Sequence, residues 1–525
     1  MTVREPSVGR VRASADRIRR VVPLEARDRR WLTLAVVPSV VAVFVYLLTN
    51  PYPAYGAGLY VQIAEEIIAG GYAPPTRIPG YTADGVPFAY PPLQFYVLAA
   101  LLDFGADPVA VARFLPSVAV VAAQVPVYLL ARDYTGSRPT GAVAAAMVAL
   151  NPQILEWHIS AGGVVRGFAF LYALTAIYAG YHVFTSGSRS AVLAGLLTFG
   201  LTLLTHPTYS LFVVVTYLLF WAVLDRSLGG LARGAVVGLG GTAVAAPWFG
   251  WIATVHGIGT FTAASSTHGG IGGGLDALYG AVSVYTAVPF AAAAYLLFVR
   301  REWFLPAWFV AAELLFQQPR FSYTAGAFAL AATGLDVVRR TGVLDRTGGR
   351  NVDWRAVGAA TLILVGTVGG GTYLAYEMSL TTDPSTPEFL DDEAVAAMEW
   401  AAAETPEDAT FVVLGDAAEW FPASAERTIL VGPWGVEWEG AESYEPQLDA
   451  YTDVSRCQNV ACVEETTATV GANPDYVYVP KGRYTVRGAG VVQFGTLDRS
   501  FEQSPRWERA FENEGVVIYR AVDAA

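Results

Sequence analysis

Long apolar runs separated by short arginine-containing segments limit most strongly what this chain can fold into. An α-helix needs about 20 apolar residues to cross the hydrocarbon core of a bilayer, and apolar runs recur between residues 31 and 376. Of the 525 residues, 54% are hydrophobic and 15% are charged, which is too apolar for a soluble protein of this length. The sequence therefore predicts a polytopic α-helical membrane protein.

The arginines predict how the chain is threaded through the membrane. Arginine clusters stay in the cytoplasm because moving them across a bilayer is costly. Arginines in alternate connections between the apolar runs therefore mark the cytoplasmic side and are consistent with about eleven spans. The predicted spans are 31–48, 109–130, 141–155, 168–184, 191–204, 209–224, 234–255, 277–299, 304–316, 323–337 and 356–376. An odd number of crossings places the C-terminal part outside the cell, so we expect a multi-pass protein of the plasma membrane.

Three parts are predicted along the chain. They are a cytoplasmic basic segment 1–30, a transmembrane domain 31–378 with a large first outer loop 50–108, and an extracytoplasmic domain 379–525. Within the first loop, the apolar stretch 91–102 is too short to span and predicts an interfacial or re-entrant helix. A glycine-rich outer loop at 256–275 is expected to be mobile.

The last part alternates a helical pattern with short β-rich runs, which predicts a small α/β or α+β domain. The helical pattern covers 392–403, and the β-rich runs cover 410–414, 428–431, 476–479, 491–494 and 516–519. Cys457 and Cys462 both fall in this part, where a small disulfide is favoured over two reduced thiols. Two cysteines are too few for a zinc site unless other residue types join them.

The charge distribution bears on habitat and on partners. The formal net charge is −12, the acidic residues concentrate in the last part, and Lys481 is the only lysine. This composition suggests a proteome adapted to high salt, such as that of a halophilic archaeon. An acidic outer surface also argues against nucleic-acid binding.

Ionisable residues gather at the predicted outer ends of the helices. Charged groups beside spanning helices are costly and therefore mark functional sites as a set. Arg166 and Arg320 are candidates to bind phosphate, because a guanidinium matches phosphate with two parallel hydrogen bonds. The same set includes Glu156, His158 and His206. Each residue alone is more typical of a side chain that settles at the headgroup level.

Two further carboxylates lie in the first loop. Glu65 belongs to an amphipathic helical pattern, where it could act as a general base, whereas its neighbour Glu66 fits a solvated polar face. Asp84 lies in a turn sequence, in which stabilising the turn is as plausible a role as catalysis. Both Glu65 and Asp84 therefore stand as candidate catalytic residues.

Several short motifs occur in a recognisable order along the membrane part. They are Gly58-Leu59-Tyr60 with Ile63-Ala64-Glu65-Glu66, Tyr90-Pro91-Pro92-Leu93, Ala112-Arg113-Phe114-Leu115-Pro116-Ser117, Leu204-Thr205-His206-Pro207 and Pro319-Arg320. Together they resemble the GT-C superfamily of membrane glycosyltransferases, which includes protein O-mannosyltransferases and aminoarabinose transferases. The resemblance implies an inverting transfer from a polyprenyl (dolichyl) phosphate-linked sugar to a glycan or protein acceptor.

The resemblance also implies roles for individual residues. The site would lie on the outer face between the first loop and the bundle, with Asp84 or Glu65 taking the acceptor proton. Arg166 and Arg320 would bind the phosphate, and Tyr60, Tyr90 and His206 would line the pocket. No cofactor is identified, no metal ligands are assigned, and a requirement for a divalent metal stays open.

The first loop departs from the pattern of that superfamily. An acidic residue normally precedes the tyrosine, but Gly56 and Ala57 occupy this place, and near 162–166 only Arg166 is charged. Either Glu65, Asp84 or Glu156 takes over, or the chain is a non-catalytic scaffold that binds lipid-linked sugars during cell-surface glycan assembly. A transporter is a further alternative, although the spans show no internal repeat and no charges at mid-membrane.

Overall fold

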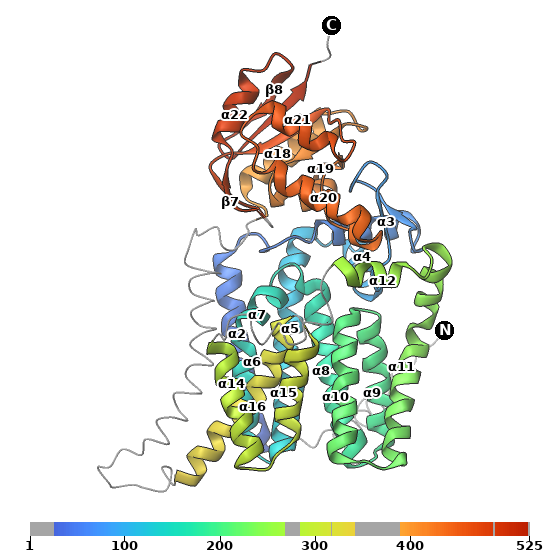
Figure 1. The fold of residues 1–525 in the computed structure, drawn as a ribbon, viewed down its shortest axis with the longest axis vertical. Coiled ribbons are helices and arrows are strands. Elements are labelled where there is room, and N and C mark those ends of the chain that lie inside the picture. The colour runs from blue at the N-terminus through green and yellow to red at the C-terminus, as the bar shows by residue number, and fades with distance from the viewer. Residues whose placement is uncertain (1–25, 268–283, 317, 342–388, 487–488, 523–525) are drawn as a thin grey trace, which may run out of the picture.

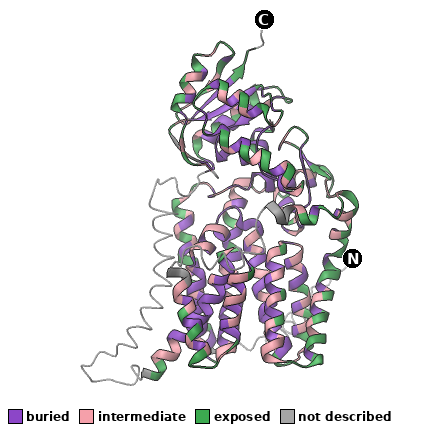
Figure 2. Cartoon of the chain, viewed as in Figure 1, coloured by how far each residue is buried: buried purple, intermediate pink, exposed green. Residues whose placement is uncertain are grey.

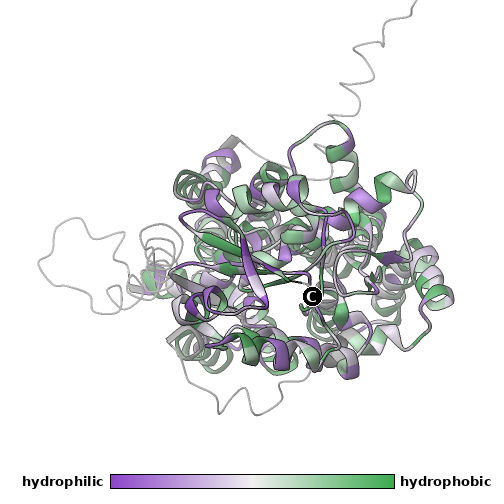
Figure 3. Cartoon of the chain, turned by 90° about the horizontal axis from the view of Figure 1, so that it is seen from above, coloured by the Kyte–Doolittle hydropathy of each residue, from purple (hydrophilic) through white to green (hydrophobic). Residues whose placement is uncertain are grey.

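A helical bundle carries a smaller α/β domain at one end, which we call the domain end (Figure 1). The computed structural model describes residues 26–267, 284–316, 318–341, 389–486 and 489–522. The predicted last span at 356–376 and residues 1–25 of the predicted basic segment lie outside the described residues. Seen from above, the domain projects over the bundle and mixes hydrophilic with hydrophobic segments (Figure 3).

Six helices in the described part are long and apolar enough to cross a membrane. They are α2 (Ala26–Thr49), α5 (Pro108–Thr135), α8 (Gly163–Thr185), α10 (Pro207–Leu224), α11 (Leu228–Val255) and α16 (Pro319–Thr341). Three predicted spans form apolar helices that are shorter, namely α9 (Arg189–Leu203), α14 (Val284–Phe298) and α15 (Phe304–Leu315). The predicted polytopic helical fold with a C-terminal α/β domain is confirmed.

The outer helices leave large apolar side chains uncovered by protein. Phe44 and Leu48 of α2 are 61% and 68% exposed, and Leu239 of α11 is 74% exposed. Figure 2 shows exposed and half-buried residues along much of α11, whereas buried residues fill the middle of the bundle. Apolar surface on this scale is unstable in water, so these faces are the ones that contact lipid.

The predicted span 141–155 is not one continuous helix. The chain forms α6 (Arg138–Ala149), a short α7 (Pro152–Ile154) and a π-helical turn, η1 (Leu155–Ile159). A residue before proline avoids the helical conformation, and Asn151 instead caps the next turn by accepting a hydrogen bond from the backbone N of Gln153 at 2.9 Å. This break leads the chain into a short turn ahead of α8.

Part of the predicted mobile loop is also helical. Residues Thr260–Thr267 form α12, whereas 268–275 lie outside the described residues. The stretch Thr260–Thr267 contains no glycine, whereas glycine, which disfavours helix, is concentrated after it. The predicted loop therefore contains a short helix, and its mobility stays a prediction.

The C-terminal domain is built on a five-stranded sheet of order β4-β3-β5-β9-β8. Its strands are β3 (Thr410–Val413), β4 (Thr428–Ile429), β5 (Tyr476–Pro480), β8 (Trp507–Glu512) and β9 (Val516–Ala521). β3 runs parallel to β4 and β5, whereas β9 is antiparallel to β5 and β8. Every residue of β5 is buried, as expected for a strand covered on both faces.

Other elements surround this sheet. The predicted helix at 392–403 is α18 (Asp392–Glu404), and the predicted run 491–494 falls in β7 (Gly490–Gln493). That strand pairs with β6 (Arg483–Val486) in a separate hairpin and does not join the sheet. The remaining helices are α19 (Phe421–Ala425), α20 (Ala441–Val454), α21 (Val460–Ala468) and α22 (Gly495–Glu502).

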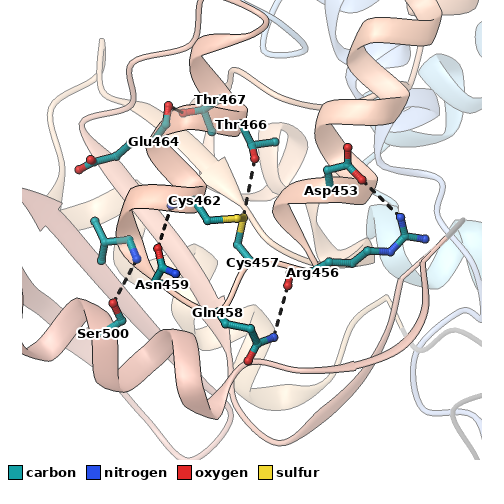
Figure 4. The surroundings of a disulfide bond; sticks show 11 residues. Asp453, Arg456, Cys457, Gln458, Asn459, Cys462, Glu464, Thr466, Thr467 and Ser500 are labelled. Atoms are coloured by element: carbon teal, nitrogen blue, oxygen red, sulfur yellow. Dashed lines mark hydrogen bonds and ion pairs between the residues drawn. A yellow bond between two sulfur atoms is a disulfide. The ribbon is translucent and has the colours of Figure 1, made fainter.

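Cys457 and Cys462 form a disulfide between the end of α20 and the start of α21 (Figure 4). Their Cα atoms are 5.6 Å apart. Asn459 caps α21 by accepting a hydrogen bond from the backbone N of Cys462 at 3.0 Å, and the backbone N of Val460 donates to Ser500 of α22 at 3.1 Å. The bridge therefore closes a turn that is already capped and tied to a neighbouring helix.

The C-terminal domain is seated on the first loop, which contains α3 (Gly58–Ala69), β1 (Arg77–Ile78), β2 (Val86–Pro87) and the predicted interfacial helix, α4 (Leu93–Asp103). Tyr81 forms a parallel bridge with Ile429 of β4, and the Tyr81 hydroxyl donates to the backbone oxygen of Glu419 at 2.5 Å. Arg77 and Glu439 form an ion pair at 2.8 Å. Figure 1 shows this loop, in blue, meeting the orange helices of the domain.

The contact between the C-terminal domain and the first loop depends on Gly58, which has no side chain. A Cβ atom on Gly58 would lie 2.0 Å from the backbone oxygen of Glu419 and 2.5 Å from the Cα of Trp420. Both are backbone atoms, so neither can rotate away. The start of α3 and the segment 419–420 are therefore packed backbone against backbone.

We predict that Gly58→Ala destabilises the protein by about 1–3 kcal/mol, because the added methyl group must push the domain away from α3. The thermal midpoint of the detergent-solubilised chain measures the effect, and proteolysis of the first loop reports the loss of seating. Gly238→Ala is the matched control, since a Cβ there meets no atom within 4 Å and helix propensity favours alanine. Equal stability of Gly58→Ala and the parent would contradict this packing.

Candidate functional site

A cavity of about 180 Å³ lies where three parts of the chain meet. These parts are the start of the first loop, the segment from η1 to the first turn of α8, and the C-terminal domain. Its polar lining includes Tyr60, Tyr90, Glu156, Arg166, Glu419 and Glu437. Four of these residues were predicted from sequence as site residues, and the two carboxylates from the C-terminal domain were not.

Backbone strain marks one wall of the cavity. Tyr55 has a φ of 60°, a left-handed conformation that is uncommon for a residue with a bulky side chain. Its ring packs against Trp157 with centroids 5.3 Å apart, and its hydroxyl donates to Glu156 Oε1 at 3.2 Å. Residues held in such conformations cluster at functional sites, where the surroundings compensate the strain.

Arg166 supplies the positive charge of the cavity. It lies in the first turn of α8, and its guanidinium carbon is 5.1 Å from the centre of the Trp157 ring. The Nη1 atom packs against Gly162, where an added Cβ would lie 2.4 Å away. Within the described part of the chain, the structure gives Arg166 no ion pair and no side-chain hydrogen bond. This guanidinium is therefore positioned by packing and has capacity to bind an anion.

Two buried carboxylates from the C-terminal domain line the same cavity as this arginine. Glu419 is 8% exposed and Glu437 is 5% exposed. The Tyr90 hydroxyl donates to Glu437 Oε1 at 3.2 Å, whereas Glu437 Oε2 has no hydrogen-bond partner among the described residues. Burial raises the pKa of Tyr90 well above its ordinary value, and the nearby Glu437 charge raises it further, so Tyr90 stays a hydrogen-bond donor.

The sequence contains only a weak sign that these two carboxylates belong to the site. Glu419 and Glu437 are each followed by tryptophan, as is Glu156, which also lines the cavity. The same pair occurs at Glu302 and Glu399, which do not line it. The pattern alone therefore does not identify the site.

Three other predicted residues form a separate buried cluster around Tyr209. His158 Nε2 lies 2.6 Å from the Tyr209 hydroxyl, and the guanidinium carbon of Arg320 is 5.4 Å from the centre of the Tyr209 ring. The ring of His206 is 5.2 Å from the same tyrosine. Arg320 is 5% exposed and lies within electrostatic reach of Arg166 and Glu156. These three predicted residues do not line the cavity.

Neither predicted catalytic residue lines the cavity. Asp84 is exposed in the turn between β1 and β2, where its backbone oxygen accepts a hydrogen bond from Arg77 at 2.9 Å. Glu65 is half-buried on α3 and faces Glu426 of the C-terminal domain. The turn interpretation of Asp84 therefore fits the structure better than a catalytic one. Among the described residues, no group of three or more His, Cys, Asp or Glu side chains could hold a metal ion.

No protein-family model matches the chain, and no curated protein matches it either. Several solved structures share its architecture. The oligosaccharyltransferase of Archaeoglobus fulgidus, tethered to an acceptor peptide, aligns with a TM-score of 0.57 and 14% identity over 86% of this chain and 69% of its own. ArnT from Cupriavidus metallidurans, bound to undecaprenyl phosphate, aligns with a TM-score of 0.52 and 14% identity over 94% and 98%.

A third similar structure is the arabinofuranosyltransferase AftD from mycobacteria. It aligns with a TM-score of 0.55 and 15% identity over 94% of this chain and 41% of its own. The chain has the GT-C fold. The superfamily resemblance is thereby supported at the level of fold, while the mannosyltransferase or aminoarabinose subtype and a halophilic archaeal source stay predictions.

The titration of Glu65 gives a testable pH dependence. Burial, and then the charges of Glu426 and Glu66, raise its pKa from 4.5 to about 7. A carboxyl that holds its proton more tightly in the folded state stabilises that state fully below the unfolded pKa. This contribution is lost as the pH rises from 4.5 to about 7.

We therefore expect the thermal midpoint of the parent to fall over this pH range and Glu65→Gln to flatten the fall. Glu65→Asp is the matched control, because it keeps a carboxyl at the same position and should retain the slope. Midpoints measured at half-unit steps from pH 4.5 to 8 give the comparison. A slope in Glu65→Gln as steep as the parent's would show that another group is responsible.

Proposed function

We propose that this chain is an inverting membrane glycosyltransferase that moves a sugar from a polyprenyl phosphate carrier to a glycan or protein acceptor outside the cell. The observation that carries the proposal is a single cavity at the domain end that joins Arg166 to the carboxylates Glu156, Glu419 and Glu437. The positive charge of the arginine suits the donor phosphate, and a carboxylate suits the hydroxyl group of the acceptor. Transfer of a sugar from donor to acceptor requires both kinds of group in one place.

Arg166 is suited to the phosphate of the donor. Arg166 is half-buried, and a guanidinium withdrawn from water without a carboxylate partner is stabilised by an anion, which it binds as phosphate with two parallel hydrogen bonds. Arg166 also belongs to the first turn of the 23-residue α8, where the helix dipole adds positive potential. Arg320, behind it in the Tyr209 cluster, adds to the same field without touching the cavity.

The location of the cavity fits a lipid-linked donor. The hydrocarbon of such a carrier belongs in the bilayer, and its phosphate belongs at the bilayer surface. The cavity lies at the ends of the spanning helices and beside the first loop, which is the place expected for the phosphate of such a donor. Tyr60, Tyr90 and Trp434 supply hydroxyl groups and ring faces of the kind that bind sugars.

The similar structures support the substrate classes. ArnT was solved with undecaprenyl phosphate, and the oligosaccharyltransferase with a tethered acceptor peptide. Because the identities are 14%, these substrates enter here as classes, a polyprenyl phosphate-linked sugar and a glycan or protein acceptor. The carrier's chain, including whether it is a dolichol, is part of the proposal.

A non-catalytic scaffold remains the second candidate. It is favoured by one observation, the absence of a carboxylate at Gly56 and Ala57 in the first loop. A scaffold would bind a lipid-linked sugar in the same cavity but would transfer nothing. Binding and transfer must therefore be measured separately.

We expect membranes that contain the chain to transfer label from a radiolabelled polyprenyl phosphate sugar to acceptor. Arg166→Ala should reduce transfer about 100-fold or more, since it removes charge stabilisation of the leaving phosphate. Arg166→Lys should retain an intermediate rate because it keeps the charge and loses the forked geometry. Parallel reactions with a chelator test a divalent metal.

The control is Arg226→Ala, which removes an exposed arginine between α10 and α11 and should transfer like the parent. Parent-like transfer by Arg166→Ala would contradict the assigned phosphate site. Donor binding without transfer from any donor would favour the scaffold.

A further inference from the structure

We infer that the proton acceptor for this transfer is Glu419, a carboxylate that the C-terminal domain inserts over Gly56 of the first loop. The inference rests on the proposed function and names a catalytic residue for it. It also assigns the C-terminal domain a direct part in the chemistry.

The carboxylate of Glu419 occupies the space in which a side chain at position 56 would begin. A Cβ atom built on Gly56 would lie 1.9 Å from Glu419 Oε2, 2.1 Å from Cδ and 2.6 Å from Oε1. Gly56 is not among the residues with a positive φ, so its backbone conformation does not by itself call for glycine. Glycine is required at this position because the space belongs to the carboxylate.

The main chain of Glu419 is held from both sides. Its backbone oxygen accepts the Tyr81 hydroxyl at 2.5 Å and packs against Gly58. Glu419 ends a short 3₁₀ turn, Asp416–Glu419, and Asp416 at the start of this turn accepts a hydrogen bond from Tyr451 of α20 at 2.5 Å. A side chain positioned in this way is pre-organised, as a general base must be.

Glu419 is the carboxylate of the three that lies over the first loop at Gly56. Glu156 belongs to the turn before α8, where it accepts hydrogen bonds from Tyr55 at 3.2 Å and from Gln153 at 2.8 Å. Glu437 accepts a hydrogen bond from Tyr90 at 3.2 Å, on the side of the cavity formed by that tyrosine. Glu419 lies within electrostatic reach of Arg166. The proton acceptor and the phosphate-binding cation are therefore arranged around one reacting centre.

The step balances with these groups alone. The acceptor hydroxyl oxygen attacks the anomeric carbon of the sugar and forms the new carbon–oxygen bond with inversion. The bond from that carbon to the phosphate oxygen breaks, and its electron pair leaves with the polyprenyl phosphate, whose charge Arg166 stabilises. The hydroxyl proton passes to the Glu419 carboxylate, which becomes a carboxylic acid and later returns the proton to solvent.

The position of the Glu419 carboxylate explains why the first loop has no acidic side chain at residue 56. A carboxylate at Gly56 would compete for the volume that Glu419 already fills, so the loop has none at this position. The acid that the sequence lacks at position 56 is supplied in the folded protein by Glu419. It comes from a segment more than three hundred residues further along the chain.

The test uses the full chain in membranes with a labelled polyprenyl phosphate sugar. Glu419→Gln should lower kcat by about 10²–10⁴-fold, the usual range for removal of a general base, while binding of the labelled donor stays within threefold of the parent. Glu419→Asp should keep part of the rate. Glu437→Gln is the comparison, and it should raise the acceptor KM more than it lowers kcat.

A double variant tests the position directly. Glu419→Ala with Gly56→Asp returns a carboxylate to the same volume from the loop side, and it should transfer at least tenfold faster than Glu419→Ala alone. Parent-like kcat in Glu419→Gln, or loss of donor binding together with transfer, would overturn the inference. A parent that binds donor but transfers nothing would instead overturn the proposed function and, with it, this inference.

Discussion

One close approach between backbones governs the arrangement of this protein. Gly56 and Gly58 have no side chains, which lets the segment ending at Glu419 and Trp420 lie directly against the start of α3. Tyr81 and Ile429 continue this contact as a short parallel bridge. Because the cavity has walls from both partners, it exists only while the C-terminal domain is seated on the first loop. The bundle, the loop and the domain therefore form one functional unit.

The membrane part contributes the cationic wall through a break in its helices. Irregular backbone at the end of a bundle is tolerated when its polar groups find partners within the protein. The turn after Asn151 and Pro152 meets this condition, and it places Glu156 and Trp157 beside Arg166. The contact of the C-terminal domain with the first loop and the break after Asn151 together bring opposite charges into one small volume. The low dielectric around them strengthens their electrostatic effect on a substrate.

The sequence predicts the membrane fold well because a span has a simple physical signature of length and hydropathy. It fails at residues 141–155, where Asn151 and Pro152 break the helix within an otherwise apolar run. Glu156 and Arg166 were predicted because charges beside spans are costly and therefore conspicuous, whereas Tyr60 and Tyr90 were predicted from the motifs that resemble the GT-C superfamily. Glu419 and Glu437 were missed because acidic residues in a soluble domain are ordinary. Only tertiary packing shows that these two are buried, and only packing shows that Asp84 is exposed.

The most direct test is an experimental structure of the full chain in lipid with a polyprenyl phosphate bound. The account predicts the phosphate in contact with the Arg166 guanidinium and the Glu419 carboxylate on the opposite side of the anomeric position, still over Gly56. A phosphate bound elsewhere, or a C-terminal domain lifted from the first loop with Glu419 in solvent, would contradict it.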